Sequence, residues 1–215
     1  MARTTDTEVT QARKAEILSA AKDVIRDHGL QGLTYDRIAH QAGLSRQLLR
    51  YYYPDQESIV VDLCDYLASR YRDLLVEGII NTNQVERLDF FLDFFFDLLD
   101  DHPMPDDLEV YDSFVAFAVG SDRLKDRLCA QYLTLGQVIV HELAIAYPDL
   151  GGKRCEELSY LFVSMMHAHW SFVATLGYSR EHSRLTRNAI DRLIRSYVDE
   201  PEPKAIVEKP WGRAD

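Results

Sequence analysis

Residues 34–53 read TYDRIAHQAGLSRQLLRYYY, which is two short helical patterns separated by a turn signal. Thr34 and Ser45 are residue types favoured at helix N-termini, and each directly precedes one of the patterns. Gly43 lies between the patterns and readily adopts the positive φ that ends a helix. The residues placed to pack where the two helices cross are Ile38, Ala39 and Leu49. This stretch therefore predicts the layout of a helix-turn-helix.

The second helix of this layout carries a polar and aromatic surface without an acidic residue. Its outward-facing residues are Arg46, Gln47, Leu48, Arg50, Tyr51 and Tyr52. Such side chains suit the major groove of DNA, where arginine binds guanine through two hydrogen bonds and glutamine binds adenine, while tyrosine reaches phosphate. A merely solvated helix face is the alternative, but three consecutive tyrosines are unusual there. With the flanking positions and the first helix included, the predicted DNA-contacting residues are Arg13, Lys14, Thr34, Tyr35, Ser45, Arg46, Gln47, Leu48, Arg50, Tyr51 and Tyr52.

Helical periodicity continues through the rest of the chain, which has only 10 glycines and 7 prolines to interrupt it. The predicted helices span residues 8–28, 35–43, 46–53, 56–80, 84–101, 107–119, 122–147, 153–176 and 180–199. Three prolines beyond residue 200 cannot continue a helix and predict a flexible tail. We therefore expect an all-α protein with a DNA-binding helix-turn-helix domain at 1–54, a larger helical bundle at 55–200, and a tail at 201–215.

Charge is distributed unevenly along the 215 residues. The whole chain holds 24 Lys and Arg against 35 Asp and Glu, a net charge of −11 that at first argues against a polyanionic partner. Residues 1–58, however, hold 8 basic and 8 acidic residues, which leaves 16 and 27 for residues 59–215. The acidic excess therefore lies almost wholly in the predicted larger domain, and it should repel DNA from every surface except the DNA-binding domain.

Several other classes of protein are not favoured. The three cysteines are isolated, which indicates neither a disulfide framework nor a zinc cluster and fits the cytoplasm. His167 and His169 lie two apart on a predicted helix and point away from each other, so they cannot chelate one metal ion together. No nucleophile elbow, phosphate-binding loop or metal triad indicates an enzyme, and no cofactor is expected. The uncharged segment 158–179 is long enough to cross a membrane, but its serines and histidines favour a buried bundle helix.

The N-terminal residues resemble one protein family over roughly fifty positions. The residues that carry the resemblance are Ile17-Leu18 and Ala20-Ala21 ahead of His28-Gly29, Leu33-Thr34 before Ile38-Ala39, Ala42-Gly43-Leu44-Ser45, and Tyr51-Tyr52-Tyr53-Pro54 followed by Glu57 and Ile59. Together they resemble the TetR-type one-component transcriptional regulators. Arg50 stands where that family usually has tyrosine, so a base contact could replace a phosphate contact. Gln56 stands where the family usually has a basic residue, which removes one expected phosphate contact.

The resemblance implies a homodimer whose two recognition helices enter successive major grooves, with half-sites ~34 Å apart. The predicted helices 153–176 and 180–199 are together too apolar for exposure. Apolar residues on both sides of the first of them fit a dimer interface in the 55–200 domain. The resemblance also implies a small-molecule pocket in the larger domain, although most of the candidates could be ordinary core. These candidates are Phe91, Phe94, Phe95, Tyr111, Phe114, Phe117, Tyr132, His141, Met166, His169 and Trp170.

Two classes of effector remain open. The aromatic candidates suit an apolar ligand such as an aromatic or acyl compound. Glu109 and Asp112, beside Tyr111 and Phe114, would instead permit a cation held by cation–π contacts. Residues 107–124 loosely resemble the corresponding part of choline-responsive betaine-pathway repressors, which names the cationic option.

We therefore expect a homodimeric cytoplasmic repressor that binds a double-stranded DNA operator and is released from it by a small-molecule effector. The alternative is a small-molecule-binding or protein-interaction helical module whose helix-turn-helix no longer engages DNA. Gln56 and the neutral charge of residues 1–58 motivate that alternative.

Overall fold

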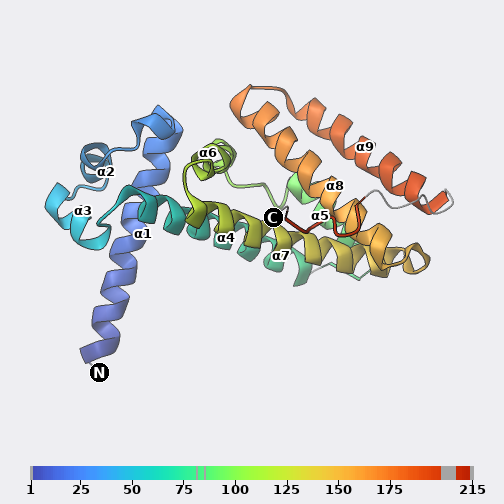
Figure 1. The fold of residues 1–215 in the computed structure, drawn as a ribbon, viewed down its shortest axis with the longest axis horizontal. Helices are drawn as coiled ribbons and strands as arrows, with labels where there is room; N and C mark the ends of the chain where they lie inside the picture. The colour runs from blue at the N-terminus through green and yellow to red at the C-terminus, as the bar shows by residue number, and fades with distance from the viewer. Residues whose placement is uncertain (1, 81, 85, 200–206, 214–215) are drawn as a thin grey trace. The chain divides into compact units, whose positions relative to one another are not determined.

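The computed structural model describes residues 2–80, 82–84, 86–199 and 207–213, with the backbone alone for residues 2–7. Within these ranges the chain forms nine α-helices: α1 (Ala2–His28), α2 (Tyr35–Gln41), α3 (Arg46–Tyr52), α4 (Gln56–Ile80), α5 (Arg87–Phe95), α6 (Leu108–Ala118), α7 (Asp122–Ala146), α8 (Gly152–Trp170) and α9 (Arg180–Asp199) (Figure 1). Short 3-10 turns at Leu30–Gly32 and Pro148–Leu150 and a π-helical turn at Ser171–Thr175 complete them. The described residues contain no β-strand, so the all-α prediction is confirmed.

The chain folds as two compact units, each made of two stretches of sequence. The first unit comprises Met1–Arg70 with Asp107–Leu128, and the second comprises Tyr71–Asp106 with Cys129–Asp215. Helices α4 and α7 therefore each contribute one part to each unit. The first unit extends beyond the boundary predicted after Pro54, and that boundary stays a prediction. Of the predicted flexible tail, residues 201–206 and 214–215 lie outside the described residues.

The first unit is built around α1. Helices α2 and α3 lie beside the C-terminal half of α1, and α6 also packs against α1 (Figure 1). Apolar side chains at helical spacing supply the core, because each of these helices turns one apolar stripe inward. The buried residues include Ile17, Ala21, Val24, Ile38, Leu49, Ile59 and Leu63.

Polar contacts hold the second stretch of the first unit to α4. At the start of α7, the Ser121 hydroxyl donates a hydrogen bond to Glu57, and Arg123 Nη1 lies 3.4 Å from another oxygen of the same carboxylate. Further along α4, Arg70 Nη1 lies 3.2 Å from Oδ2 of the buried Asp107. The first turn of α4, which directly follows α3, is therefore tied to the first turn of α7.

The helix predicted over residues 84–101 is shorter than expected, because α5 ends at Phe95. Asp97 adopts a φ of 53°, a left-handed conformation that aspartate tolerates better than most residues. Its Oδ1 atom accepts a hydrogen bond from the Met104 backbone N–H at 3.2 Å. This contact with the following loop turns the chain out of the helix, and helical periodicity does not reveal it.

The helix predicted over residues 153–176 is divided. Helix α8 ends at Trp170, and the π-helical turn Ser171–Thr175 and a loop follow. The uncharged segment 158–179 is therefore not one helix. Within the described ranges, α7 alone is long and apolar enough to cross a membrane, with a mean hydropathy of 1.3 over 18 residues. This criterion rests on length and composition, and a core helix of a soluble protein also meets it.

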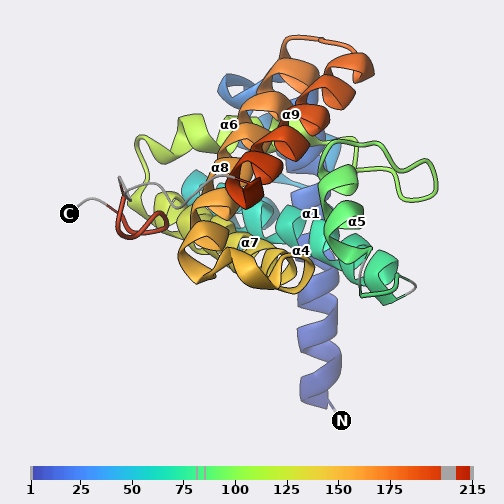
Figure 2. The same cartoon turned by 90° about the vertical axis from the view of Figure 1, so that its right-hand side faces the viewer.

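The second unit packs α5, α8 and α9 around an aromatic layer. Figure 2 shows α8 and α9 side by side. Near the end of α8, the Trp170 indole Nε1 donates a hydrogen bond of 2.9 Å to the Phe95 carbonyl oxygen. The ring of Trp170 stacks on Tyr71 with centroids 6.0 Å apart. Because the indole N–H has a partner, the large ring is buried without an unsatisfied polar atom.

A cluster of four charges joins α5 to α9. The side chain of Arg187 on α9 is 8% exposed, and it donates hydrogen bonds to Asp93 at 2.7 Å and to Asp89 at 3.0 Å on α5. It also pairs with Asp191 on its own helix. Burial, together with the charges of Asp89 and Asp191, raises the pKa of Asp93 although Arg187 opposes that shift. One buried guanidinium therefore forms ion pairs with three carboxylates.

The two histidines at the end of α8 have separate hydrogen-bond partners. His169 is buried, with Nε2 3.0 Å from the Ser183 hydroxyl and Nδ1 3.2 Å from the Thr186 hydroxyl. His167 Nδ1 lies 2.8 Å from the Tyr132 hydroxyl. Across the residues that the structure describes, His, Cys, Asp and Glu side chains form no group of three that could hold a metal ion.

Replacing His169 with glutamine should reduce the loss of stability in mild acid. Burial, and secondarily the charge of His182, lowers the pKa of His169 in the folded state. The pKa of this histidine in the unfolded chain is about 6.5, so below that pH the unfolded chain binds a proton that the folded chain does not bind. The free energy of unfolding therefore decreases by at most about 1.4 kcal/mol for each unit by which the pH is lowered. Urea unfolding between about pH 7 and pH 5 measures this slope. His141→Gln is the matched control, because it makes the same substitution at an exposed position.

Candidate nucleic-acid interface

The turn between α2 and α3 has the geometry that its sequence predicts. Gly43 has a φ of 64°, and the Leu44 N–H donates to the Ala39 carbonyl oxygen at 2.9 Å, which closes the end of α2. Open space surrounds the position of an added Cβ at Gly43, so glycine is needed there for its backbone angle. The Ser45 hydroxyl accepts the Leu48 N–H at 3.1 Å and caps α3. These contacts set the direction in which α3 leaves the turn.

Hydrogen bonds join the start of the helix-turn-helix to the residues at its end. The Tyr35 hydroxyl donates to the Tyr53 carbonyl oxygen at 2.8 Å, which joins the start of α2 to the end of α3. Burial and the charge of Asp55 raise the pKa of Tyr35, so this hydroxyl stays protonated. Gln56 Nε2 donates to the Leu33 carbonyl oxygen at 2.8 Å. Gln56 therefore contributes a structural hydrogen bond at the position where a phosphate-binding charge was expected.

The outward surface of α3 is basic and aromatic. Arg46, Gln47 and Arg50 are exposed, and Tyr51 is 79% exposed. Tyr52 is half-buried and meets the ring of Tyr51 edge to face, with centroids 5.2 Å apart.

Two contacts position the arginines on this surface. Arg46 Nη1 lies 3.2 Å from Asp36 Oδ1, and both side chains are more than half exposed. The Arg50 guanidinium lies over the Tyr35 ring, 5.0 Å from its centroid. Neither contact occupies all the donors of a guanidinium, so both arginines keep N–H groups for a ligand.

The two basic residues predicted on the first helix have acidic partners within the chain. Arg13 pairs with Glu16 one turn later. Lys14 Nζ lies 3.2 Å from Asp62 and 4.9 Å from the centroid of the Tyr53 ring. The Tyr53 hydroxyl donates to the same Asp62 at 3.0 Å. Lys14 is therefore part of the packing between α1 and α4, and its contact with phosphate stays a prediction.

One basic residue of the motif was not among the predicted contacts. Arg37 on α2 is exposed, and its Nη1 atom donates to the Gly32 carbonyl oxygen at 3.3 Å. Sequence reasoning concentrated on α3 and assigned Arg37 no role. The signal in the sequence is its position, three residues after the helix-capping Thr34 and within the first turn of α2.

Removing the N-cap of α3 should destabilise the folded helix that presents the candidate interface. Ser45→Ala removes the acceptor of the Leu48 N–H and should lower the free energy of unfolding by about 1 kcal/mol. Chemical unfolding at fixed protein concentration measures this loss. Ser45→Asn is the control, because asparagine also caps helices and should restore most of the stability. Equal stability of the alanine and asparagine variants would contradict the capping role.

The predicted effector-pocket residues are distributed over both compact units. Tyr111, Phe114 and Phe117 lie on α6 in the first unit, where the rings of Tyr111 and Phe114 are 5.5 Å apart. The predicted pocket residues that are buried in the second unit are Phe91, Phe94, Phe95, Met166, His169 and Trp170. Tyr132 is half-buried and His141 is exposed. The structure therefore does not bring the eleven residues together in a single cluster of one unit.

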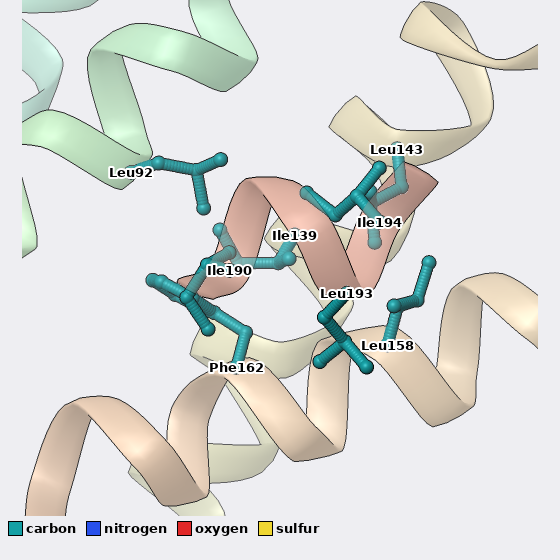
Figure 3. Close-up of a pocket in the computed structure, with 8 residues that line it drawn as sticks. All are labelled: Leu92, Ile139, Leu143, Leu158, Phe162, Ile190, Leu193 and Ile194. Carbon is teal, nitrogen blue, oxygen red and sulfur yellow. The ribbon is translucent and has the colours of Figure 1, made fainter. Parts of the chain in front are cut away.

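A small apolar cavity lies among α5, α7, α8 and α9 (Figure 3). It is lined by Leu92, Ile139, Leu143, Leu158, Phe162, Ile190, Leu193 and Ile194. Its free interior of about 10 Å³ is close to the space that one water molecule needs. None of the predicted pocket residues lines it, because aliphatic residues at helical spacing were interpreted as core.

A shallower depression of about 250 Å³ lies at the turn between α7 and α8. Tyr147, Asp149, Arg154 and Val198 are among its lining residues, so it combines polar and apolar groups. It too contains none of the predicted pocket residues.

Comparison with known proteins gives a family match and many structural matches. Residues 17–63 match the model of the bacterial regulatory proteins of the tetR family. Curated protein sequences give no match. The chain is similar in fold to a putative TetR-family regulator from Rhodococcus sp., with 22% identity, a TM-score of 0.66, and coverage of 85% of this chain and 98% of that one.

Two further solved structures show the same fold. A TetR transcription regulator from Haloarcula marismortui has 19% identity and a TM-score of 0.73, with coverage of 88% of this chain and 97% of that one. A putative transcriptional regulator from Saccharomonospora viridis in complex with choline has 19% identity and a TM-score of 0.70, with coverage of 86% and 96%.

The family match covers the helix-turn-helix and the helices on either side of it, which include the capped turn and the exposed surface of α3. The structural matches extend the likeness to the all-helical fold of nearly the whole chain. The predicted helix-turn-helix is confirmed, and the resemblance of this part of the chain to the TetR family is confirmed for residues 17–63. Residues 17–63 thus match the N-terminal model of the TetR family, and the whole chain shares the fold of solved structures described as TetR-family regulators.

Proposed function

We propose that the chain is a homodimeric repressor that reads a double-stranded DNA operator with α3 and leaves it when a small-molecule effector binds. The part of this proposal that concerns DNA is supported by the exposed surface of α3. Its polar residues Arg46, Gln47 and Arg50 are exposed, whereas Leu49 is fully buried and Ser45 caps the helix. The residues that fold the helix are therefore different from those available to the bases.

Each exposed side chain suits a particular group on DNA. Arg46 and Arg50 suit guanine O6 and N7, and Gln47 suits adenine N6 and N7. Leu48 is 38% exposed and suits the methyl group of thymine. The hydroxyls and basic groups around them, which suit phosphates, belong to Arg13, Lys14, Thr34, Tyr35, Ser45, Tyr51 and Tyr52.

Exposed apolar side chains of the second unit support the homodimer. Phe172 is 52% exposed, Leu176 is 62% exposed and Leu185 is 65% exposed, and all three lie in or beside α9 and the π-helical turn. A second copy would remove this surface from water. Within one chain α8 already buries residues of both its predicted apolar faces, including Phe162 and Val163. We therefore propose the dimer contact at residues 172–185 rather than along the whole of α8.

For the effector we propose a site among the aromatic side chains around Trp170. The similar structure from Saccharomonospora viridis holds choline, a cation that aromatic rings bind through cation–π contacts. The same rings would accept an apolar aromatic compound. Thermal unfolding with choline, and separately with benzoate, tests the two classes, because a ligand that binds the folded state raises its melting temperature.

Selection from random-sequence duplexes at low salt tests the DNA-binding function. We expect enrichment of a pseudo-palindrome with half-sites ~34 Å apart, bound by a dimer in sedimentation analysis. The selected duplex should bind far more tightly than a scrambled duplex at physiological salt. Equal binding of the two duplexes would overturn this function. Effector-dependent stabilisation without any enrichment would instead favour a ligand-binding module that no longer engages DNA.

A further inference from the structure

A tight turn near the C-terminus presents Trp211. Residues 209–212 read Lys-Pro-Trp-Gly, and the Gly212 N–H donates to the Lys209 carbonyl oxygen at 2.9 Å. Proline at the second position and glycine at the fourth are typical of a β-turn. Trp211 therefore occupies the third position of a turn that holds its own shape through a local hydrogen bond.

The indole of Trp211 lies in a notch on α7 whose floor is Gly136. A Cβ atom added to Gly136 would lie 2.2 Å from Trp211 Cζ2 and 2.4 Å from Cε2, far inside van der Waals contact. The benzo edge of the ring therefore rests directly on the helix backbone. Any other residue at position 136 would fill the place that the indole takes.

Side chains of the adjacent helix and of the turn complete the notch. The ring of Tyr160 on α8 meets the Trp211 ring edge to face, with centroids 5.5 Å apart. Pro210 is buried beside it. The buried Ser159 hydroxyl donates to the Gly136 carbonyl oxygen at 2.7 Å, which joins α7 to α8 at the floor of the notch. The notch is thus a slot between two helices that are held together independently of the turn.

One polar atom of the docked ring is left unsatisfied. Trp211 Nε1 is buried without a hydrogen-bond partner, whereas the indole N–H of Trp170 has one. Burying a donor without an acceptor opposes docking, because that donor binds water when the turn is released. The apolar contacts of the indole hold the turn in place while the N–H favours release, which is the balance expected of a reversible contact.

We propose that the Lys209–Gly212 turn is an intramolecular ligand, and that the notch at Gly136 is a binding site for a flat, indole-like ring. The turn occupies the site when no other aromatic ring is present, and a free ring displaces it. The tether raises the local concentration of Trp211 at the site, so an external ligand must compete with it.

The variant Gly136→Ala tests the docking of Trp211. Alanine favours a helix more than glycine does, so α7 should remain folded while the methyl group expels the indole. In the wild type we expect acrylamide to quench Trp211 fluorescence weakly, after subtraction of the Trp170 signal recorded with Trp211→Phe. In Gly136→Ala the quenching constant should rise severalfold. Equal quenching in the two proteins would overturn the proposal.

The variant Trp211→Ala tests the ligand specificity of the empty notch, with 3-methylindole as the probe. If the turn leaves the notch in about one molecule in ten, removing Trp211 should raise the affinity for 3-methylindole about tenfold. The double variant Gly136→Ala with Trp211→Ala should lose this gain, because its notch is filled. Affinity that is the same in the wild type and Trp211→Ala would overturn the proposal.

Protein concentration distinguishes docking within one chain from exchange between two copies. Protection of Trp211 from acrylamide should be unchanged when the wild type is diluted. Protection that disappears on dilution would assign the notch to the turn of a second copy, and the intramolecular proposal would be wrong.

Discussion

Replacing Arg187 with leucine is expected to lower the free energy of unfolding by about 2–3 kcal/mol. Arg187 is buried and donates hydrogen bonds to Asp89 and Asp93 on α5 and to Asp191 on α9. Removing one partner of a buried ion pair costs about 3–5 kcal/mol, because the remaining charge has no counterion. The three carboxylates are partly exposed, and solvent screening reduces that loss.

Urea unfolding at fixed protein concentration measures this change, since dimer formation would make stability depend on concentration. Arg192→Leu is the matched control, because Arg192 is exposed on the same helix, lies outside the proposed dimer contact, and its loss should be nearly neutral. The penalty of Arg187→Leu should shrink in acid. Protonation removes the repulsion among the carboxylates, and the pKa of Asp93 is already raised in the wild type. Equal midpoints for the Arg187 and Arg192 variants would contradict the role of the cluster.

Replacing Arg50 with alanine is expected to weaken operator binding by about 1–3 kcal/mol, or roughly tenfold to more than a hundredfold, and to relax the preference at one base pair. The Arg50 guanidinium is exposed and lies over the Tyr35 ring, which limits the orientations it can adopt. A guanidinium held in this way is suited to bind guanine through two hydrogen bonds. Titration of the selected duplex and of its single-base variants measures both effects.

Two further variants distinguish a base-specific contact of Arg50 from a non-specific electrostatic attraction to DNA. Arg50→Lys keeps the charge but cannot form the two-pronged contact, so it should preserve the salt dependence and lose the base preference. Arg72→Ala removes an exposed arginine of the other compact unit and should leave affinity nearly unchanged. If Arg50→Ala weakens all duplexes alike and flattens the salt dependence, Arg50 contacts phosphate.

The parts of the fold that were predictable from sequence depend on local chemistry. Thr34 and Ser45 cap α2 and α3 as expected, and Gly43 has the positive φ that the turn requires. In each case a side chain or a backbone angle acts within four residues of its own position. Helical periodicity likewise predicted the span of α4, because one apolar stripe on that helix is buried.

The parts that were not predictable depend on contacts between distant segments. Asp97 ends α5 by accepting a hydrogen bond from the loop at Met104, and Gln56 donates to Leu33 from 23 positions away. Trp211 was assigned to a flexible tail, yet its ring rests on Gly136 of α7. A local sequence pattern does not predict contacts between residues that lie so far apart in the chain. The aromatic pocket candidates illustrate the same point, since composition does not tell which rings face a cavity and which face one another.

The polar contacts between Glu57 and the start of α7 affect which segments of proteins with this fold can be exchanged. Ser121 and Arg123 both contact Glu57, and Arg70 pairs with Asp107, so the compact unit that holds the helix-turn-helix includes residues 107–128 as well as residues up to 70. A chimera that takes only residues 1–54 from this protein would lose the packing of α6 against α1 and the contacts of Lys14 and Tyr53 with Asp62. If the proposed DNA-binding function is correct, exchange of DNA specificity with proteins of the same fold should succeed more often when both stretches are transplanted together.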